Sequence, residues 1–469
     1  MRKAALINAS GKYSKVLLSI LVNAVLARIL SADDYGIVAI ITVFSTFFTT
    51  FSDMGFGAAI IQKKELKRDD INNIYSFTVY ISFVLMIIFA LLSYPIANFY
   101  NNKVYVKLGQ LLSISLLFNS LNMVPNGILN REKKFGSIAI RTVVVYLGSA
   151  IVTVFLAFRG FRYYALAIQA ILTALLTFVW NFWTTHPKFK LHFNMASIKL
   201  VLNYSGYQFA FNIVNYFSRN LDNLLTGKLL GSAELGYYNK AYTLMLYPVN
   251  NLTGVISPVL HPLLSDYQRQ VKIIYVKYIK IFRLIAIIGI YVAAVCFLSS
   301  GEIIKIMYGK NWDAAIICFQ LLSIAIIPQM LNAIAGGIFQ ALGNTKLLFV
   351  NSTINTVITA VAILIGILSG KTIAALSLAV GIAYICHFLT TFYMLIKMGF
   401  NFHMLDTIKE LYREIILLIV MVTAVPLYPL TLNNIFLSLI AKCVYLGIIY
   451  LIAMIVTGDF RFGRRLLFK

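Results

Sequence analysis

The sequence predicts an all-α, polytopic membrane protein with about fourteen transmembrane helices. Of its 469 residues, 60% are hydrophobic and only 12% are charged, whereas soluble domains carry about 25% charged residues. So little charge cannot cover a globular surface, and most of the chain must face lipid or other helices. Most apolar runs reach about 20 residues, the length of a membrane-spanning helix and about twice that of a barrel strand.

Polar residues, Gly and Pro divide these runs into predicted spans. In chain order the spans are 10–30, 37–61, 74–97, 106–129, 138–158, 163–183, 203–230, 238–263, 273–298, 315–340, 347–368, 372–396, 413–429 and 435–457. The loops between them are too short for a sizeable soluble domain. Residues 1–27 also resemble a secretory signal, but the internal repeat described below gives this segment a partner in mid-chain and favours a retained helix.

The basic residues indicate how the spans are oriented. The net charge is +24, and 28 of the 40 Lys and Arg residues lie in alternate connections that include both termini and the loops 61–71, 130–141 and 264–283. The other connections hold 10. The positive-inside rule places the first set, with both termini, in the cytoplasm. The charge forms no single island, which argues against nucleic-acid binding, and part of it suits anionic membrane lipids.

An internal repeat predicts the domain organisation. Residues 110–114 recur as residues 320–324, and nine of the 21 residues from 110 to 130 are identical at this offset. A weaker match at an offset of 200 pairs Asn23 with Asn223, Arg28 with Lys228, Leu30 with Leu230 and Gly36 with Gly236. Six spans separate the copies, so the two halves have the same orientation, and Gln110 and Gln320 should occupy equivalent places. Parallel repeats of this kind are typical of transporters.

Span 7 carries polar side chains at helical spacing on one face. They are Asn212, Asn215, Arg219, Asp222, Asn223 and Thr226. Arg219 lies roughly 16 Å from the outer end of its span, and a charge near mid-bilayer costs about 2.5–3.5 kcal/mol on insertion scales. This face is therefore expected to look into a cavity or onto a partner helix. Alternatively, Arg219 and Asp222 neutralise one another.

Three other spans have milder polar stripes. Span 1 has Lys12, Lys15, Ser19 and Asn23, span 2 has Thr42, Thr46, Thr49 and Asp53, and span 8 has Asn250, Asn251, Ser257 and His261. Together the stripes predict a hydrated path along the repeat interface. The candidate substrate-binding residues are Arg219, Asp222, Asn223, Asn215, Lys15, Asn23, Asp53 and Asn250.

Each of these features also has a purely structural interpretation. Asp53 could cap a helix or pair with Lys63 and Lys64, and single Asn, Ser and Thr residues often join helices in membranes. Lys442, inside the last span, is expected to extend its ammonium group to the membrane surface.

The motifs of several enzyme classes are absent from the sequence. There is no Walker A loop, no GxGxxG after a strand and no HExxH. The five histidines have no metal-ligand spacing, and the four cysteines lie in apolar stretches without CxxC spacing. We therefore predict no catalytic residue, no metal site and no cofactor.

Three motifs resemble those of bacterial polysaccharide repeat-unit flippases of the Wzx type. The first is FSDMGFG at residues 51–57, followed by Ile61 and Gln62. The most specific is NLDNLLTGKLLG at residues 220–231, followed by LGYY at residues 235–238. A third, YGK with Trp312, is similar to an outer loop before span 10. The resemblance covers about residues 5–400.

This resemblance implies membership of the multidrug/oligosaccharidyl-lipid/polysaccharide (MOP) exporter superfamily, located in the bacterial cytoplasmic membrane. The implied fold has two parallel six-helix lobes, residues 1–200 and 201–400, around a central cavity. Residues 401–469 add two further spans and a basic tail. The implied substrate is an undecaprenyl-pyrophosphate-linked oligosaccharide used for capsule, O-antigen or teichuronic acid-like polysaccharide. Arg can hold a pyrophosphate through two hydrogen bonds, whereas sugars need Asn, Tyr and Ser.

Two other functions compete with this interpretation. A cation-coupled multidrug exporter of the same superfamily would favour acidic cavity residues over Arg219 and Lys15. A membrane polysaccharide polymerase or ligase would need a catalytic outer loop, which the sequence lacks. Coupling to Na⁺ or H⁺ and association with other polysaccharide-assembly proteins are open at this point.

Overall fold

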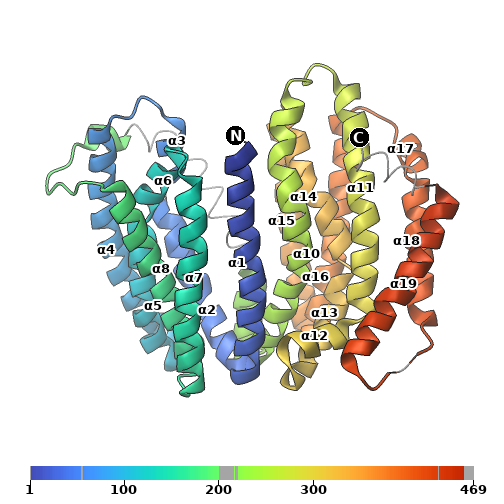
Figure 1. The fold of residues 1–469 in the computed structure, drawn as a ribbon, viewed down its shortest axis with the longest axis horizontal. Coiled ribbons are helices and arrows are strands. Elements are labelled where there is room, and N and C mark those ends of the chain that lie inside the picture. The colour runs from blue at the N-terminus through green and yellow to red at the C-terminus, as the bar shows by residue number, and fades with distance from the viewer. Residues whose placement is uncertain (1, 54–55, 200–215, 217–219, 431, 459–469) are drawn as a thin grey trace. The chain divides into compact units, whose positions relative to one another are not determined.

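The computed structural model describes residues 2–53, 56–199, 216, 220–430 and 432–458. Within these residues the chain is helical and forms no β-strand. It divides into two compact units, Met1–Gly236 and Tyr237–Lys469, which are described separately (Figure 1). The division into residues 1–200, 201–400 and 401–469 stays a prediction.

The first unit is a bundle of long helices with two short ones. Its helices are α1 (Arg2–Ile29), α2 (Ala32–Asp53), α3 (Phe56–Gln62), α4 (Arg68–Phe99), α5 (Val104–Leu121), α6 (Met123–Arg131), α7 (Phe135–Phe158) and α8 (Tyr163–Thr185). Residues 220–229 are also helical, and α10 (Ser232–Ser265) begins in this unit and continues into the second.

The second unit contains the remaining helices. They are α11 (Val271–Leu298), α12 (Ser300–Tyr308), α13 (Asp313–Ser323), α14 (Ile326–Ala341), α15 (Thr345–Gly370), α16 (Ile373–Tyr393), α17 (Met404–Glu410), α18 (Tyr412–Ala424) and α19 (Ile435–Thr457). Short 3₁₀ turns precede α13 and follow α18, and a π-helical turn extends α16.

These helices confirm a multi-pass membrane protein. Among the described residues, nine helices are long and apolar enough to cross a membrane, or ten if the bent pair α13–α14 forms one span. Helices α1, α10 and α18 coincide with predicted spans but do not meet that criterion. The predicted span 203–230 lies mostly outside the described residues.

Three predicted spans, 37–61, 106–129 and 315–340, each coincide with two helices, and in the last two a proline follows the end of the first helix. Helix α5 ends at Leu121, four residues before Pro125 in α6, and α13 ends at Ser323, five residues before Pro328 in α14. The proline ring clashes with the carbonyl four residues earlier and has no N–H to donate, which weakens the helix there. Proline alone does not decide the break, because α4 continues through Pro95, and residues 104–131 together form one unbent span. The axes of α13 and α14 differ by 54°.

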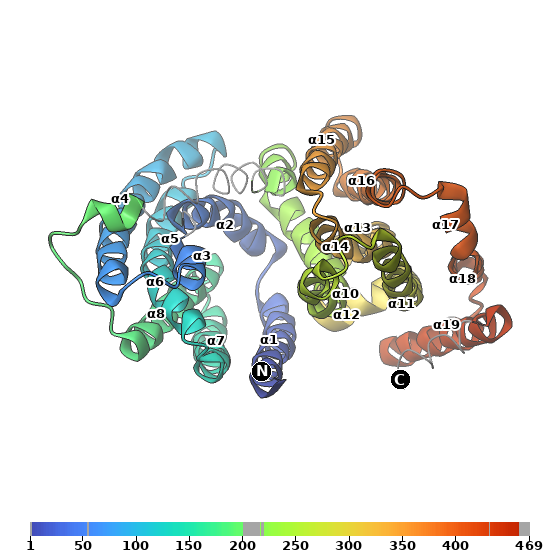
Figure 2. The same ribbon diagram turned by 90° about the horizontal axis from the view of Figure 1, so that it is seen from above.

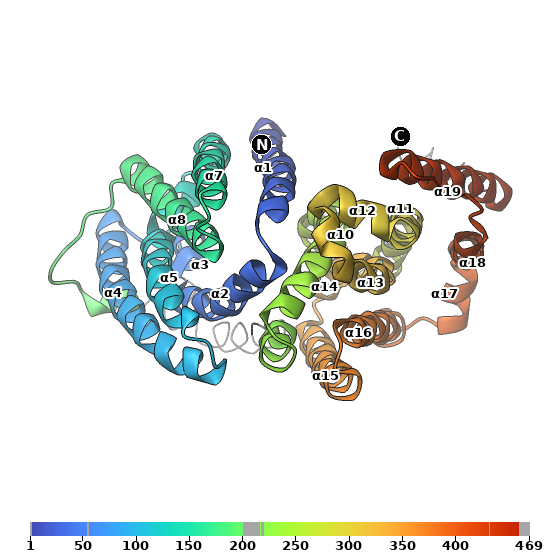
Figure 3. The ribbon, with the colours of Figure 1, turned by 90° about the horizontal axis from the view of Figure 1, so that it is seen from below.

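The packing of helices in the second unit repeats that in the first. In the first unit α5 packs against α4 and α8, and α7 packs against α8. In the second, α13 and α14 pack against α11 and α16, and α15 packs against α16. Figures 2 and 3 show both bundles end on. This correspondence supports the sequence repeat, because α5–α6 and α13–α14 carry its strongest match.

The first turns of α2 and α10 approach each other reciprocally. A Cβ atom added to Gly36 would lie 1.7 Å from the carbonyl oxygen of Ser232, and one added to Gly236 would lie 1.9 Å from that of Ala32. Only glycine permits so close a backbone contact. Gly36 and Gly236 are one of the pairs that the repeat matches at an offset of 200. Gly36 of the first segment meets Ser232 of the second, and Gly236 of the second meets Ala32 of the first. A reciprocal contact of this kind relates the two segments by a local two-fold axis.

Helices α18 and α19 are held to the rest of the second unit by apolar packing and by two partly buried ion pairs. Leu417, Met421, Leu446 and Tyr450 pack against α11. Arg283 pairs with Glu414 at 2.5 Å, joining α11 to α18.

The second ion pair gives Lys442 a partner at the end of the predicted spans. Its ammonium group pairs with Glu302 of α12 at 2.6 Å and donates to the Leu298 carbonyl at 3.0 Å. The pair joins α19 to α12. That the side chain extends to the membrane surface stays a prediction.

Candidate functional site

The residues predicted for span 7 are only partly described. Arg219 and Asn215 lie outside the described residues, so their roles stay predictions. Asp222 is buried, with 5% of its surface exposed, and its carboxylate accepts a hydrogen bond from the Asn223 backbone N–H at 2.8 Å. Thr226, one turn further, is fully buried. This end of the predicted stripe therefore faces protein rather than lipid.

The predicted residues of α1 and α10 are described within their own units, and their role in substrate binding stays a prediction. Lys15 is exposed on α1, and its ammonium lies 6.0 Å from the centre of the Tyr146 ring on α7. Asn23 donates to the Ser19 carbonyl of its own helix at 2.8 Å. Asn250 is exposed on α10, in the second unit.

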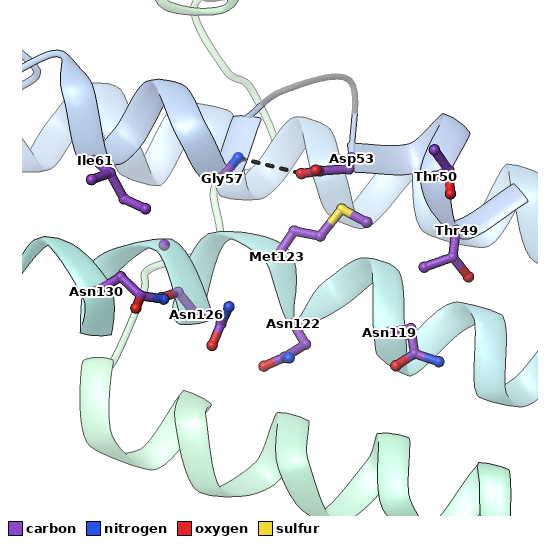
Figure 4. Close-up of a pocket in the computed structure, with 11 residues that line it drawn as sticks. Thr49, Thr50, Asp53, Gly57, Ile61, Asn119, Asn122, Met123, Asn126 and Asn130 are labelled. Atoms are coloured by element: carbon purple, nitrogen blue, oxygen red, sulfur yellow. Dashed lines mark hydrogen bonds between the residues drawn. The ribbon is translucent and has the colours of Figure 1, made fainter. Parts of the chain in front are cut away.

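Asp53, by contrast, lines a polar pocket of about 380 Å³ within the first unit (Figure 4). One wall comes from α2 and α3, and the other from α5 and α6. The lining residues are Thr49, Thr50, Asp53, Gly57, Ile61, Asn119, Asn122, Met123, Asn126, Gly127 and Asn130. The Asp53 carboxylate accepts a hydrogen bond from the Gly57 N–H at 3.4 Å. It therefore caps α3, which is one of the structural roles expected for it from the sequence. The same carboxylate also faces the pocket.

Four asparagines on α5 and α6 recur at steps of three or four residues along the pocket wall. Two of them are tied to a buried arginine behind the wall. Arg141 of α7 has 8% of its surface exposed and donates to Asn181 of α8 at 2.5 Å and to Asn126 at 3.4 Å. Asn181 in turn donates to the side-chain oxygen of Asn122 at 2.7 Å. These bonds join α6, α7, α8 and the junction between α5 and α6 around one guanidinium group.

The arginine determines which way the amides point. A guanidinium group only donates hydrogen bonds, so the atoms that meet it must be the oxygens of Asn126 and Asn181. The amino group of Asn181 then donates to the oxygen of Asn122. With their oxygens engaged, Asn122 and Asn126 have their amino groups left to offer to the pocket, and Figure 4 shows the nitrogen of Asn126 turned toward the α2–α3 wall.

Sequence reasoning found half of this site. The span-2 stripe contains Thr49 and Asp53, but the amides and Arg141 were missed. Arg141 was counted as the last charge of the loop 130–141, although it also falls within the predicted span 138–158. The asparagine spacing at 119, 122, 126 and 130 was visible in the sequence and could have indicated the polar wall.

The pocket offers little to a metal ion. Among the described residues no group of three or more His, Cys, Asp or Glu side chains comes together. The oxygens of Asn122 and Asn126 are turned away from the cavity, which leaves Asp53 as the only charged oxygen donor on its walls. The pocket combines one carboxylate with hydroxyl and amide groups, which suits hydrogen bonding to a neutral polar ligand.

Comparison with known proteins now identifies the family. A family model described as "Polysaccharide biosynthesis protein" matches residues 25–317. The chain belongs to this family. The lipopolysaccharide biosynthesis protein WzxC of Escherichia coli (strain K12) is 25% identical to it, over 80% of this chain and 76% of WzxC.

Two solved structures have the same fold. The lipid II flippase MurJ, in an inward closed conformation, superposes with a TM-score of 0.76 over 97% of this chain and 99% of MurJ, at 18% identity. An inward-facing multidrug resistance transporter of the MATE family, in the MOP superfamily, gives a TM-score of 0.66 over 82% of this chain and 94% of the transporter, at 14% identity. The chain therefore has a MOP transporter fold, as the sequence predicted.

Proposed function

We propose that the chain moves undecaprenyl-pyrophosphate-linked oligosaccharide repeat units from the inner to the outer leaflet of the cytoplasmic membrane. The observation that carries this proposal is the combination of a polysaccharide-biosynthesis family with the fold of a lipid flippase. Two rocking units that expose a site to one side and then to the other perform such transport without covalent chemistry. The product would serve a surface polysaccharide such as capsule, O-antigen or a teichuronic acid-like polymer.

A deletion experiment tests this function. Removing the gene from its native strain should abolish the surface polysaccharide and cause lipid-linked repeat units to accumulate in the membrane, and expression of the chain should reverse both effects. Loss of drug resistance with normal surface polysaccharide would instead favour a cation-coupled exporter. Activity on isolated lipid-linked chains in detergent would favour a polymerase or ligase.

Arg219 is the proposed anchor for the pyrophosphate. A doubly charged diphosphate needs a cation in a cavity of low dielectric constant, and arginine can make two parallel hydrogen bonds to it. Arg219→Gln should abolish export while the protein remains in the membrane, and Arg219→Lys should retain part of it. If Arg219 only balances Asp222, the double change Arg219→Gln with Asp222→Asn should restore export, because no unpaired buried charge remains.

The proposed orientation places both termini in the cytoplasm, on the evidence of the 28-to-10 distribution of basic residues. A cysteine introduced at Lys67, between α3 and α4, should resist an impermeant thiol reagent in intact cells and react after the cells are opened. Labelling in intact cells would reverse the topology. Coupling to Na⁺ or H⁺ and contacts with other polysaccharide-assembly proteins are further proposals that the export assay can address.

A further inference from the structure

The polar pocket of the first unit has two walls with different hydrogen-bonding character. On the α2 wall the hydroxyls of Thr49 and Thr50 donate to the carbonyls of Ser45 and Thr46 at 3.0 and 2.9 Å. Their protons are thus engaged, and toward the pocket these hydroxyls can only accept. The Asp53 carboxylate beside them also accepts. This wall therefore presents acceptors.

The facing α5–α6 wall presents donors at its centre. The oxygens of Asn122 and Asn126 are bonded to Asn181 and Arg141, so their amino groups are what they can turn to a ligand. Arg141 also places a buried positive charge behind this wall. The electrostatic field of that charge favours a ligand that places its oxygen atoms next to these amino groups.

This arrangement selects among three classes of ligand. A divalent metal ion is held by carboxylates together with other oxygens, whereas the described lining carries one carboxylate, Asp53, and Arg141 behind the facing wall repels cations. A phosphate or pyrophosphate would meet the Asp53 carboxylate and be repelled. A sugar hydroxyl both donates and accepts, so neighbouring hydroxyls of one ring can donate to Asp53 and accept from Asn126. The volume of about 380 Å³ lies within the usual range of roughly 300–1,000 Å³ for small-ligand sites.

We infer that this pocket is a saccharide subsite, in which the Asp53 carboxylate accepts hydrogen bonds from sugar hydroxyls while the Asn126 amino group donates one to a hydroxyl or ring oxygen of the repeat unit. The inference rests on the proposed function. Arg141 is a positioning residue, because it fixes the direction of the amide without lining the pocket. The pyrophosphate then binds elsewhere, so sugar recognition and charge recognition are separate.

The experiment uses the purified full chain in detergent and two probes. One probe is oligosaccharide released by mild acid from the surface polysaccharide of the native strain, and the other is inorganic pyrophosphate. Asp53→Asn, which keeps the shape of the side chain, and Asn126→Leu should weaken oligosaccharide binding about tenfold or more by calorimetry. Pyrophosphate binding should stay within about twofold in both variants.

Gln110→Leu is the matched control. Gln110 is an exposed amide on α5 that bonds to the Tyr94 hydroxyl at 3.4 Å and does not line the pocket. This variant should bind both probes as the wild-type chain does. If Asn126→Leu loses both probes, the shape-preserving Asp53→Asn decides the question.

Several outcomes would overturn the inference while the proposed function stands. In the first, the wild-type chain restores export in the deletion strain, but the purified Asp53→Asn variant binds oligosaccharide as tightly as the wild-type chain does. Another is a wild-type chain that binds pyrophosphate but no oligosaccharide. A third is saturable Na⁺ binding that Asp53→Asn abolishes without affecting oligosaccharide. Failure of the wild-type chain to restore export would overturn the proposed function itself.

Discussion

Arg283 and Lys442 of the second unit and Arg141 of the first unit are accommodated in different ways. In the second unit Arg283 and Lys442 each meet a carboxylate, Glu414 and Glu302, on a neighbouring helix. In the first unit Arg141 meets only the amide oxygens of Asn126 and Asn181 in the contacts described. The carboxylates neutralise their partners, whereas the amides leave the positive charge of Arg141 in place.

This difference assigns the cations two roles. Arg283 and Lys442 join helices, whereas Arg141 orients side chains of the pocket wall. The ion pairs join α18 and α19 to α11 and α12, far along the chain from any pocket residue. Arg141 instead turns two amides of a pocket wall and adds its field to theirs. We therefore expect the ion pairs to matter for stability and Arg141 to matter for ligand binding.

Breaking the Arg283–Glu414 pair should have the largest effect on stability. Glu414 has only 4% of its side chain exposed, and removing one partner of a buried pair costs about 3–5 kcal/mol. Arg283→Met should lower the free energy of unfolding of the purified protein in detergent by that amount. The double variant Arg283→Met with Glu414→Leu should recover most of the loss, because it leaves no unpaired charge, and it should export polysaccharide normally once folded. A double variant as unstable as the single one would contradict this role.

Arg141→Met should cost less stability but more function. It leaves the oxygens of the buried Asn181 and the half-buried Asn126 without their donor, a loss of about 2 kcal/mol. The asparagines can then turn over, so oligosaccharide binding should fall more than it does in the Arg283 and Glu414 double variant. Calorimetry on both variants makes the comparison. Equal oligosaccharide binding would remove the distinction between the two kinds of buried cation.

The Lys442–Glu302 pair should have the smallest effect, and it depends on pH. Burial by itself raises the pKa of Glu302, which lies in α12 outside the predicted spans, but hydrogen bonds from Lys442 and Ser438 outweigh it and lower the pKa below its usual 4.5. A carboxyl with a lowered pKa stabilises the fold above its unfolded pKa, and this stability is lost as the pH falls through the folded value. The melting temperature of Lys442→Met should therefore fall less than that of the wild-type chain on acidification. If the melting temperatures of the variant and the wild-type chain fall equally with pH, the Lys442–Glu302 pair does not cause the loss of stability in acid.

Much of the fold could be predicted because hydropathy determines it. Each predicted span except 203–230 coincides with one or two helices, since long apolar runs in a membrane must satisfy their backbone hydrogen bonds internally. The breaks before Pro125 and Pro328 were missed, because the apolar runs continue across both prolines and hydropathy does not register the lost hydrogen bond.

The site could be predicted only where one helix carries it. The stripe of Thr49 and Asp53 follows helical spacing, so one span was enough to indicate it. Arg141, Asn181 and Asn122 lie on separate helices, and their meeting depends on how α5, α7 and α8 pack. The Lys442–Glu302 pair was missed for the same reason, as its partners are 140 residues apart.

Flipping by the purified chain in lipid vesicles tests the central claim most directly. Vesicles containing a radiolabelled lipid-linked oligosaccharide are treated with an impermeant enzyme that cleaves the sugar from outside. In protein-free vesicles only the outer-leaflet pool is cleaved, and reconstitution of the chain should expose the inner pool as well. Asp53→Asn and Arg219→Gln should each slow this exposure, while Gln110→Leu should not. An inner pool that stays protected with the wild-type chain present, in vesicles shown to contain folded protein, would contradict the account.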